Sequence, residues 1–562
     1  MLAYLLYSIR YCLWALGNLL RRLSRAPDYV TFTLEGEYPE LRQPPGNFIM
    51  RRLRPPKISL QELAEQFRTI AADARVRGVV LHLRPLYMRP GQLDSLRDLI
   101  TELRAAGKRV VAWSYTYTSG TYYVACAAND ILLIPGGTVA SLGLLHRYVY
   151  LADALERGGL QADILQITPY KSAGDMFTRS SMSDEVRQMA NWLMDAAYDE
   201  VLRAIAEGRR MDKEAVRALI DNTPCTDVRA KEMGAVDEVI SEEDLPTYLQ
   251  EGPEPAHLTT WDKAKPRLLR FPPTPPGRYV ALLSIEGNIV DGHSQRPPFK
   301  PPIPIPFILS ERAGDLSVVQ VARKVLADKR AAAVVLYVDS GGGSATASEA
   351  MRAALEKIAA RKPLVVAMGP VAASGGYWVS TPGQVIIAQP NTITGSIGVL
   401  EGKFVNAGLL EKLLVNREII SRGKTALFYD FERPFSDEER GIVWESIQRI
   451  YDMFLDRVSA SREMTRQEVD AIGGGRVWSG RQALEKGLVD EFGGLERALE
   501  KARQLAGLSE RAPVRAFYPD KKPIAPLPEA ASALTYALEG LRMFNRPGPL
   551  CLCPLVSERR IA

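Results

Sequence analysis

The sequence predicts an α/β protein made of two tandem modules, each with a parallel sheet and packed helices. Two observations lead to this fold class: short apolar runs alternate with longer amphipathic segments, and the chain of 562 residues repeats itself once. Apolar strands alternating with helices are typical of a parallel sheet covered by helices. In the second half we expect strands at Ala332 to Val338, Leu364 to Met368 and Val385 to Ala388, and helices at Leu316 to Ala327 and Thr346 to Ala360.

The internal repeat sets the domain boundaries. Ser119 to Val124 matches Ser374 to Val379, and Ser141 falls on Ser396 at the same offset of 255 residues. Three further pairs of segments match: Tyr29 to Gly36 with Tyr279 to Gly287, Gly78 to Leu83 with Ala333 to Val338, and Gly234 to Glu238 with Gly487 to Glu491. A repeat of this kind indicates duplicated structural units. We expect an N-terminal helix over residues 1–26, a first module over 27–250, a Pro-rich linker over 251–276, a second module over 277–510, and an extension over 511–562.

Two segments outside the regular pattern also carry expectations. Gln295 to Pro306 contains six prolines and so cannot be a central strand; we expect a surface loop there, over a binding groove. The extension, which we place outside the repeat, is expected to carry one short helix at Glu529 to Met543.

Composition excludes several classes of protein. Apolar residues make up 46% and charged residues 24% of the chain, which is ordinary for a globular protein and unlike a disordered, collagen-like or polytopic membrane protein. The net charge is only +5 and no dense basic block is present, so no nucleic-acid partner is expected. Five cysteines do not form a disulfide framework, and Cys551 and Cys553 lack the second ligand pair of a zinc site.

The N-terminus has the pattern of a membrane-associated helix. Leu2 to Leu20 is mostly apolar, with Arg10 and Asn18 inside it, and Arg21, Arg22 and Arg25 follow. We expect a membrane anchor that lies in the interface or spans marginally. If it spans, the arginines after it favour a cytoplasmic catalytic body. The alternative is an amphipathic helix packed on the protein or on another subunit.

Two small-residue motifs follow predicted strands of the second module. Asp339 to Ser344 contains three consecutive glycines before a helix, so backbone N–H groups there can stabilise an oxyanion; the motif matches neither a P-loop nor G-x-G-x-x-G. Ala372 to Trp378 places Ser374 among small residues at a strand-to-helix junction, where its hydroxyl can be presented to a substrate. The alternative for this second motif is a turn whose small residues serve packing alone.

A serine nucleophile needs a base, and histidine is scarce. The four histidines are His82, His146, His257 and His293, and none lies in a recognisable loop near either motif. A buried lysine can accept a proton near neutral pH, because burial disfavours its charged form. Ser–Lys pairs are a known variant of the catalytic triad.

Four motifs together resemble the signal peptide peptidase A (SppA) family, of the long tandem-repeat type: Val338 to Ser344, Ala372 to Trp378, Thr394 to Gly398 and Pro169 to Ala173. The similarity runs from Tyr29 to Ala506. The resemblance implies a Clp/crotonase-like fold in each module and a membrane-associated serine endopeptidase that digests residual signal peptides. It also implies a homo-oligomer such as a tetramer, a bacterial inner-membrane location, and no cofactor or metal.

The resemblance also implies site residues. Ser374 matches the nucleophile, Lys171 the general base, and Gly342 and Gly375 the oxyanion-hole donors, while Ser396 can orient the lysine. The family loop usually reads Asn-Ser-Pro-Gly-Gly, whereas this chain has Asp339-Ser340-Gly341-Gly342-Gly343, which adds a negative charge near the oxyanion and loses a rigid proline.

The repeat leaves a second candidate for each role. Lys424 is an alternative base, because it follows Ser374 by about the same interval as Lys171 follows Ser119. Ser119 is expected to be silent, because Arg84 to Pro90 stands where the second copy has its glycine loop. Two alternative functions also remain open at this point: a catalytically silent scaffold or binding protein of the same fold, and a crotonase-like acyl-CoA enzyme.

Overall fold

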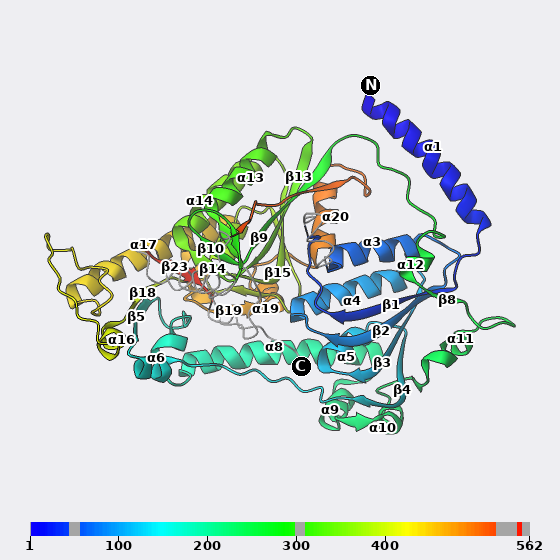
Figure 1. Ribbon diagram of the computed structural model, residues 1–562, viewed down its shortest axis with the longest axis horizontal. Coiled ribbons are helices and arrows are strands. Elements are labelled where there is room, and N and C mark those ends of the chain that lie inside the picture. The colour runs from blue at the N-terminus through cyan, green and yellow to red at the C-terminus, as the bar shows by residue number, and fades with distance from the viewer. Residues whose placement is uncertain (1, 44–56, 298–309, 524–547, 554–562) are drawn as a thin grey trace.

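The computed structural model describes residues 2–43, 57–297, 310–523 and 548–553, and it contains two helix-covered sheets and a third mixed sheet between distant parts of the chain (Figure 1). The repeat and the tandem α/β organisation are confirmed. The strands and helices expected at residues 332–338, 364–368, 385–388, 316–327 and 346–360 are all present, with ends that differ by at most five residues.

The first sheet has the strand order β6-β4-β3-β2-β1-β8, with β7 beside β4. Its strands are β1 (Tyr29–Gly36), β2 (Gly78–Leu86), β3 (Arg109–Tyr117), β4 (Asp130–Val139), β6 (Cys225–Thr226), β7 (Glu238–Val239) and β8 (Leu258–Thr260). Its helices are α3 (Leu60–Ala71), α4 (Pro90–Ala105), α5 (Ser119–Ala125), α9 (Lys213–Asp221), α10 (Asp227–Glu232), α11 (Leu245–Tyr248) and α12 (Trp261–Ala264), with a 3₁₀ turn at Glu242–Asp244.

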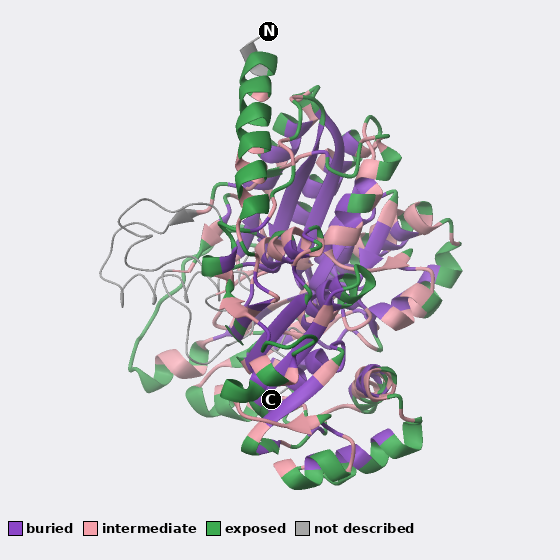
Figure 2. Ribbon diagram, turned by 90° about the vertical axis from the view of Figure 1, so that its right-hand side faces the viewer, coloured by how far each residue is buried: buried purple, intermediate pink, exposed green. Residues whose placement is uncertain are grey.

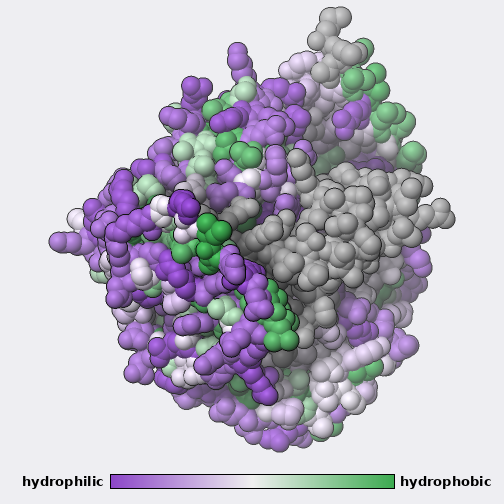
Figure 3. Space-filling view, turned by 60° about the vertical axis from the view of Figure 1, so that its left-hand side comes forward, coloured by the Kyte–Doolittle hydropathy of each residue, from purple (hydrophilic) through white to green (hydrophobic). Residues whose placement is uncertain are grey.

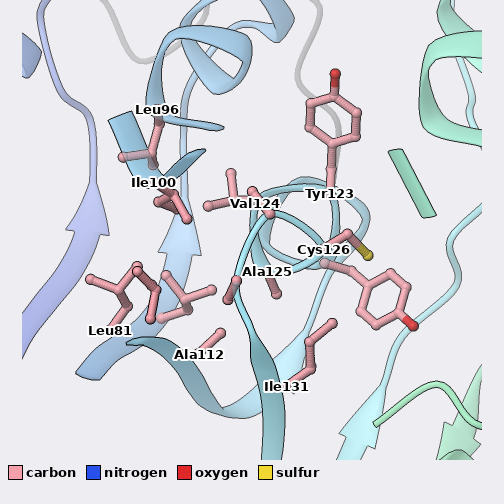
Figure 4. Packing of buried hydrophobic residues seen from close by; sticks show 14 of the residues in the cluster. Leu81, Leu96, Ile100, Ala112, Tyr123, Val124, Ala125, Cys126 and Ile131 are labelled. Atoms are coloured by element: carbon pink, nitrogen blue, oxygen red, sulfur yellow. The ribbon is translucent and has the colours of Figure 1, made fainter. Parts of the chain in front are cut away.

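The core of this module lies where α4 and α5 cover β2 and β3. Leu96 and Ile100 of α4 and Val124 of α5 pack toward Leu81 of β2 and Ala112 of β3 (Figure 4). These strands are buried on both faces, which explains why their sequence is continuously apolar rather than alternating.

The second sheet repeats this arrangement with the order β19-β17-β15-β13-β9-β21, and β16 joins β15 to β20. Its strands are β9 (Tyr279–Glu286), β13 (Ala331–Ser340), β15 (Leu364–Ala373), β16 (Val385–Ala388), β17 (Ile393–Gly395), β19 (Val477–Ser479), β20 (Glu491–Phe492) and β21 (Val514–Phe517). The helices of this half are α13 (Asp315–Ala327), α14 (Ala345–Ala359), α15 (Gly375–Ser380), α16 (Ala407–Lys412), α17 (Asp437–Arg462), α18 (Arg466–Ile472), α19 (Gly480–Glu485) and α20 (Leu495–Leu505).

The edge strands of the two sheets change the expected limits of the repeat. β8 lies inside the segment that was expected to be a linker, and it pairs with β1 in parallel. β21 lies inside the extension and pairs with β9 in the same way. The placement of residues from Arg511 onward outside the repeat was therefore wrong for β21. The two strands are only three and four residues long, and β8 lies within the Pro-rich stretch, so the apolar pattern of the sequence did not reveal them.

The third sheet joins residues that are far apart in sequence. Its order is β22 (Lys522–Pro523), β11 (Gln295–Arg296), β12 (Arg312–Gly314), β10 (Asn288–Val290), β14 (Gly342–Ser344), β23 (Leu550–Leu552), β18 (Leu400–Val405) and β5 (Gln161–Gln166). β5 belongs to the first copy but pairs antiparallel with β18 of the second. The Pro-rich segment expected as a loop begins with β11, and most of it lies outside the described residues, as does the helix expected at Glu529 to Met543.

Helix α8 connects the modules. It spans Asp184–Arg209, follows the short helices α6 (Ala152–Gly158) and α7 (Asp175–Thr178), and runs beneath both modules in Figure 1. Its first half packs on the second module, where the rings of Trp192 and Trp478 stack with centroids 4.9 Å apart. Its second half, at Leu202 and Ile205, belongs to the core of the first module. This helix holds the preceding segment, residues 161–183, against the second module.

Helix α1 (Leu2–Leu23) projects from the body and is exposed along most of its length (Figures 1 and 2). It touches the body through Trp14 and Asn18, whose side-chain N–H groups donate to the carbonyl oxygen of Arg270 at 2.7 and 2.8 Å. Among the described helices, none combines the length and the hydropathy that crossing a bilayer requires.

Candidate active site

Ser374 stands at the sharp turn between β15 and α15. Its φ of 56° and ψ of −117° are unusual for a residue with a side chain, and its N–H donates to the Gly395 carbonyl at 2.7 Å. Strained turns of this kind between a strand and a helix present a serine hydroxyl in a fixed direction. The residue is fully buried, so the hydroxyl meets protein groups on every side.

Lys171 reaches this hydroxyl. Its Nζ lies 2.8 Å from Ser374 Oγ, and 3.1 Å from both the Oγ and the carbonyl oxygen of Ser396. Lys171 is 1% exposed, and these three partners are uncharged. Burial lowers the pKa of Lys171 to about 8, because the charged amine loses hydration that no carboxylate replaces.

The position of Lys171 depends on Gly474 and Gly475 of the second module. The Tyr170 N–H donates to the Gly474 carbonyl at 3.1 Å. A Cβ atom on Gly475 would lie 2.2 Å from the Lys171 backbone nitrogen, and the φ of Gly475 is +87°. Only glycine allows these two backbone segments to approach this closely. The lysine of the first copy is thus fixed by close packing on the second.

Gly342 and Gly375 lie side by side at the start of β14 and α15. A Cβ on Gly342 would stand 2.7 Å from the Gly375 nitrogen, and a Cβ on Gly375 would stand 2.7 Å from Ser348 Oγ. Gly342 has a φ of +100°, and its N–H donates to Ser340 Oγ at 3.1 Å. The glycine loop and the first turn of α15, which follows Ser374, are therefore in direct backbone contact.

Asp339 is not an isolated charge. Its carboxylate forms an ion pair with Arg89 of the first copy, and both side chains are partly buried. Arg89 comes from the segment that replaces the glycine loop in the first copy. The negative charge that Asp339 adds near the glycine loop is therefore paired with the positive charge of Arg89.

The other candidates lie elsewhere. Lys424 is exposed and its amine pairs with Glu438 at 2.6 Å, so it does not approach Ser374. Ser119 Oγ donates to the Ser141 carbonyl at 2.9 Å, and no lysine bonds to it in the part of the chain that the structure describes.

Three contributors to the site were missed from the sequence. They are Ser340, Arg89 and the C-terminal segment with Cys551 and Cys553, whose strand β23 pairs with β14. The C-x-C pattern was considered only as a metal site; among the described residues no cluster of His, Cys, Asp and Glu could hold a metal ion. The alternating Leu-Cys-Leu-Cys pattern was the available signal for a strand.

A strained serine between two glycine motifs, with a buried amine beside its hydroxyl, defines a site of the serine peptidase class. The model of peptidase family S49 matches residues 102–254 and 356–509, one region in each module. The chain belongs to this family.

Relatives of this chain are named as proteases. The chain is 32% identical to "Serine protease SPPA, chloroplastic" of Arabidopsis thaliana, over 80% of this chain and 66% of that protein, so it spans just under two thirds of that relative. It is 31% identical to "Protease 4" of Haemophilus influenzae, over 82% of this chain and 75% of that protein. A solved mutant of a membrane-bound stomatin-specific protease, in complex with a substrate peptide, aligns with a TM-score of 0.26 and 13% identity, covering 46% of this chain and 99% of that one.

Proposed function

We propose that this chain is an endopeptidase that cleaves extended apolar peptides through a dyad of Ser374 and Lys171. The observation that carries the proposal is the 2.8 Å approach of Lys171 Nζ to Ser374 Oγ inside a buried site. The neutral amine takes the proton from the hydroxyl as Ser374 Oγ attacks the peptide carbonyl. The resulting oxyanion accepts hydrogen bonds from the N–H of Gly375 and from the N–H of Gly342, which gives up its bond to Ser340 Oγ for this purpose.

The remaining steps use the same groups. The protonated Lys171 gives its proton to the leaving amine, which departs and leaves an ester between Ser374 and the substrate. Water then attacks this ester, with Lys171 again taking a proton. As the second tetrahedral species collapses, Lys171 returns this proton to Ser374 Oγ, which frees the serine and the acid product, and the acid then ionises in water. Ser396 holds the amine toward Ser374 through its hydroxyl and its carbonyl.

The substrate class follows from the surfaces around the dyad. β14 runs directly from the glycine loop, and extended peptides bind such strands by adding a strand to the sheet. The neighbouring apolar cluster contains Ala173, Phe177 and Leu400, with Ile164 and Phe404 beside it. Apolar side chains fit this surface, which supports signal-peptide cores as substrates, as the SppA resemblance implies.

We also propose that α1 attaches the protein to a membrane surface. Ten large hydrophobic side chains of α1 are exposed, from Tyr4 to Leu23, and Arg21 and Arg22 lie in its last turn. On the face shown in Figure 3, hydrophobic residues of the body form small separate areas among hydrophilic ones. A helix that is apolar on the outside and ends in arginines suits the boundary between acyl chains and headgroups.

A fluorophosphonate probe tests the dyad. We expect the purified protein to label at Ser374, and both Ser374→Ala and Lys171→Ala to lose labelling. Lys424→Ala is the matched control, because it removes an exposed amine at the alternative position, and it should label normally. Labelling that persists in Ser374→Ala, or full peptidase activity in Lys171→Ala, would refute the assignment. A silent scaffold would show no labelling in any variant.

A further inference from the structure

The C-terminal segment Gly548 to Cys553 runs through the active site. Within it, β23 lies between β14 and β18 and is antiparallel to both. Leu552 is opposite Gly342, and Cys551 is opposite Gly343. The Cys553 N–H donates to the Gly341 carbonyl at 2.7 Å, which extends the ladder beyond the strand.

The side chains of this segment are buried. Leu550 is 6% exposed, and Cys551, Leu552 and Cys553 are fully buried. The two leucines join the apolar cluster of Phe177 and Leu400. The thiols point to other pockets: Cys551 packs in the main core of the second module, and Cys553 packs with residues that include Met189 and Ala373. Alternate side chains therefore enter separate apolar pockets, as expected for a peptide bound in extended form.

The segment also touches the catalytic groups. A Cβ on Gly342 would lie 1.9 Å from the Cys551 carbonyl oxygen, so the backbones of the glycine loop and of β23 are in direct contact. A substrate strand that pairs with β14 on this side would have to occupy the space that β23 fills, because each edge of a strand can pair with only one other strand.

We propose that Gly548 to Cys553 is an internal peptide ligand of the active site, which competes with peptide substrates and keeps the enzyme inhibited until it leaves. The competition with catalysis rests on the proposed function, whereas occupancy of the β14 edge does not. The occupant is a segment of the same chain, Leu550 to Cys553, whose sequence Leu-Cys-Leu-Cys has no charge and so suits these pockets.

Removal of the segment is the first test. A chain that ends at Pro547 should react with the fluorophosphonate probe at least severalfold faster than the full chain. The synthetic peptide Gly-Pro-Leu-Cys-Leu-Cys, added to the truncated protein, should slow labelling competitively. Leu552→Glu, which places a charge in the apolar pocket, should mimic truncation, whereas Leu316→Glu on the exposed face of α13 should leave the rate unchanged.

Binding without catalysis separates the two proposals. In the truncated protein with Ser374→Ala, a fluorescein-labelled copy of the peptide should still bind, as measured by fluorescence polarisation. If no variant labels but the peptide binds, the dyad assignment fails and the internal ligand stands. If the full chain, the truncated chain and Leu552→Glu label at equal rates, Ser374→Ala does not label, and the peptide neither binds nor inhibits, the internal ligand is refuted and the dyad stands. Loss of the C-terminal residues from the wild-type protein, but not from Ser374→Ala, in intact-mass measurements would make the segment a substrate and overturn its role as an inhibitor.

Thiol accessibility reports release directly. Cys12 is exposed, whereas Cys551 and Cys553 are buried, and burial raises the pKa of Cys551 to about 12. Iodoacetamide should alkylate Cys12 well before either tail thiol in the full chain, and Leu552→Glu should remove this delay. Cys126 and Cys225 of the first module are buried controls that should stay protected, which excludes global unfolding. Rapid alkylation of both tail thiols in the unaltered chain would contradict the proposal.

Discussion

Arg89 of the first copy forms an ion pair with Asp339 of the second, one residue before Ser340, whose Oγ accepts the Gly342 N–H. The segment of the first copy that lost its glycine loop thus supports the loop of the second. The pair is partly buried, so removing one partner leaves a charge whose desolvation is uncompensated.

The first prediction concerns this pair. Arg89→Ala should lower kcat/KM roughly tenfold, because an unpaired carboxylate near the loop opposes the developing oxyanion and costs about 1–3 kcal/mol. The double variant Arg89→Ala with Asp339→Asn should recover most of the activity, since it removes the charge as well as its partner. Steady-state kinetics on a peptide substrate check this. Equal activity for the single and double variants would show that the charge has no effect.

The pH profile reports the protonation of Lys171. The base must be neutral to accept the serine proton, and burial lowers its pKa to about 8. Activity should therefore rise with pH, falling about tenfold per unit below about pH 8 and levelling off above it. A profile of kcat/KM from pH 5 to 10, with a substrate that does not titrate in this range, measures it. A profile that is flat from pH 6 upward would exclude a lysine with this pKa as the base.

Ser396 is a positioning residue, and it can be tested against its counterpart in the repeat. Its Oγ is 3.1 Å from Lys171 Nζ. Ser396→Ala should lower kcat roughly tenfold with little change in KM, because it frees the amine without touching the peptide site. Ser141→Ala, at the matching position of the first copy, should be neutral, since only its carbonyl contacts Ser119. A change confined to KM in Ser396→Ala would point instead to substrate binding.

Gly475 tests whether the fold of one copy sets the position of the other copy's lysine. An alanine there would place its Cβ 2.2 Å from the Lys171 backbone, so Lys171 must move and activity should fall by two orders of magnitude or more. Gly423 has nearly the same φ, +89°, but open space around it. Gly423→Ala carries a similar backbone penalty and should remain active. Circular dichroism and thermal unfolding of both variants distinguish displacement of Lys171 from loss of the fold.

The sequence predicted the duplicated α/β fold and marked Ser374 and Gly342 as candidate site residues, because both leave local signals. Ser374 and Gly342 stand in short motifs after apolar strands, and the two copies can be aligned by eye. Contacts between the copies leave no such signal. The partner of Asp339 is 250 positions away, and the strand that covers β14 lies in a segment with no repeat partner. Such pairings depend on how β5, α8 and β23 cross between sheets, which periodicity within one segment cannot show.

The exposed helix α1 gives the last prediction. Leu13 and Leu16 are 65% and 57% exposed, and Trp14, between them, faces the body through its bond to Arg270. The double variant Leu13→Glu with Leu16→Glu should therefore keep the fold and the labelling of Ser374 while losing affinity for vesicles, because each buried leucine contributes about 1.5–3 kcal/mol to insertion. Co-sedimentation with vesicles containing anionic lipid measures the loss. Leu316→Glu on the body is the control that should still sediment. If the α1 variant sediments as well as the wild type, the helix is not the membrane contact; if it instead changes the oligomeric state in sedimentation velocity without altering vesicle binding, α1 packs on a second subunit.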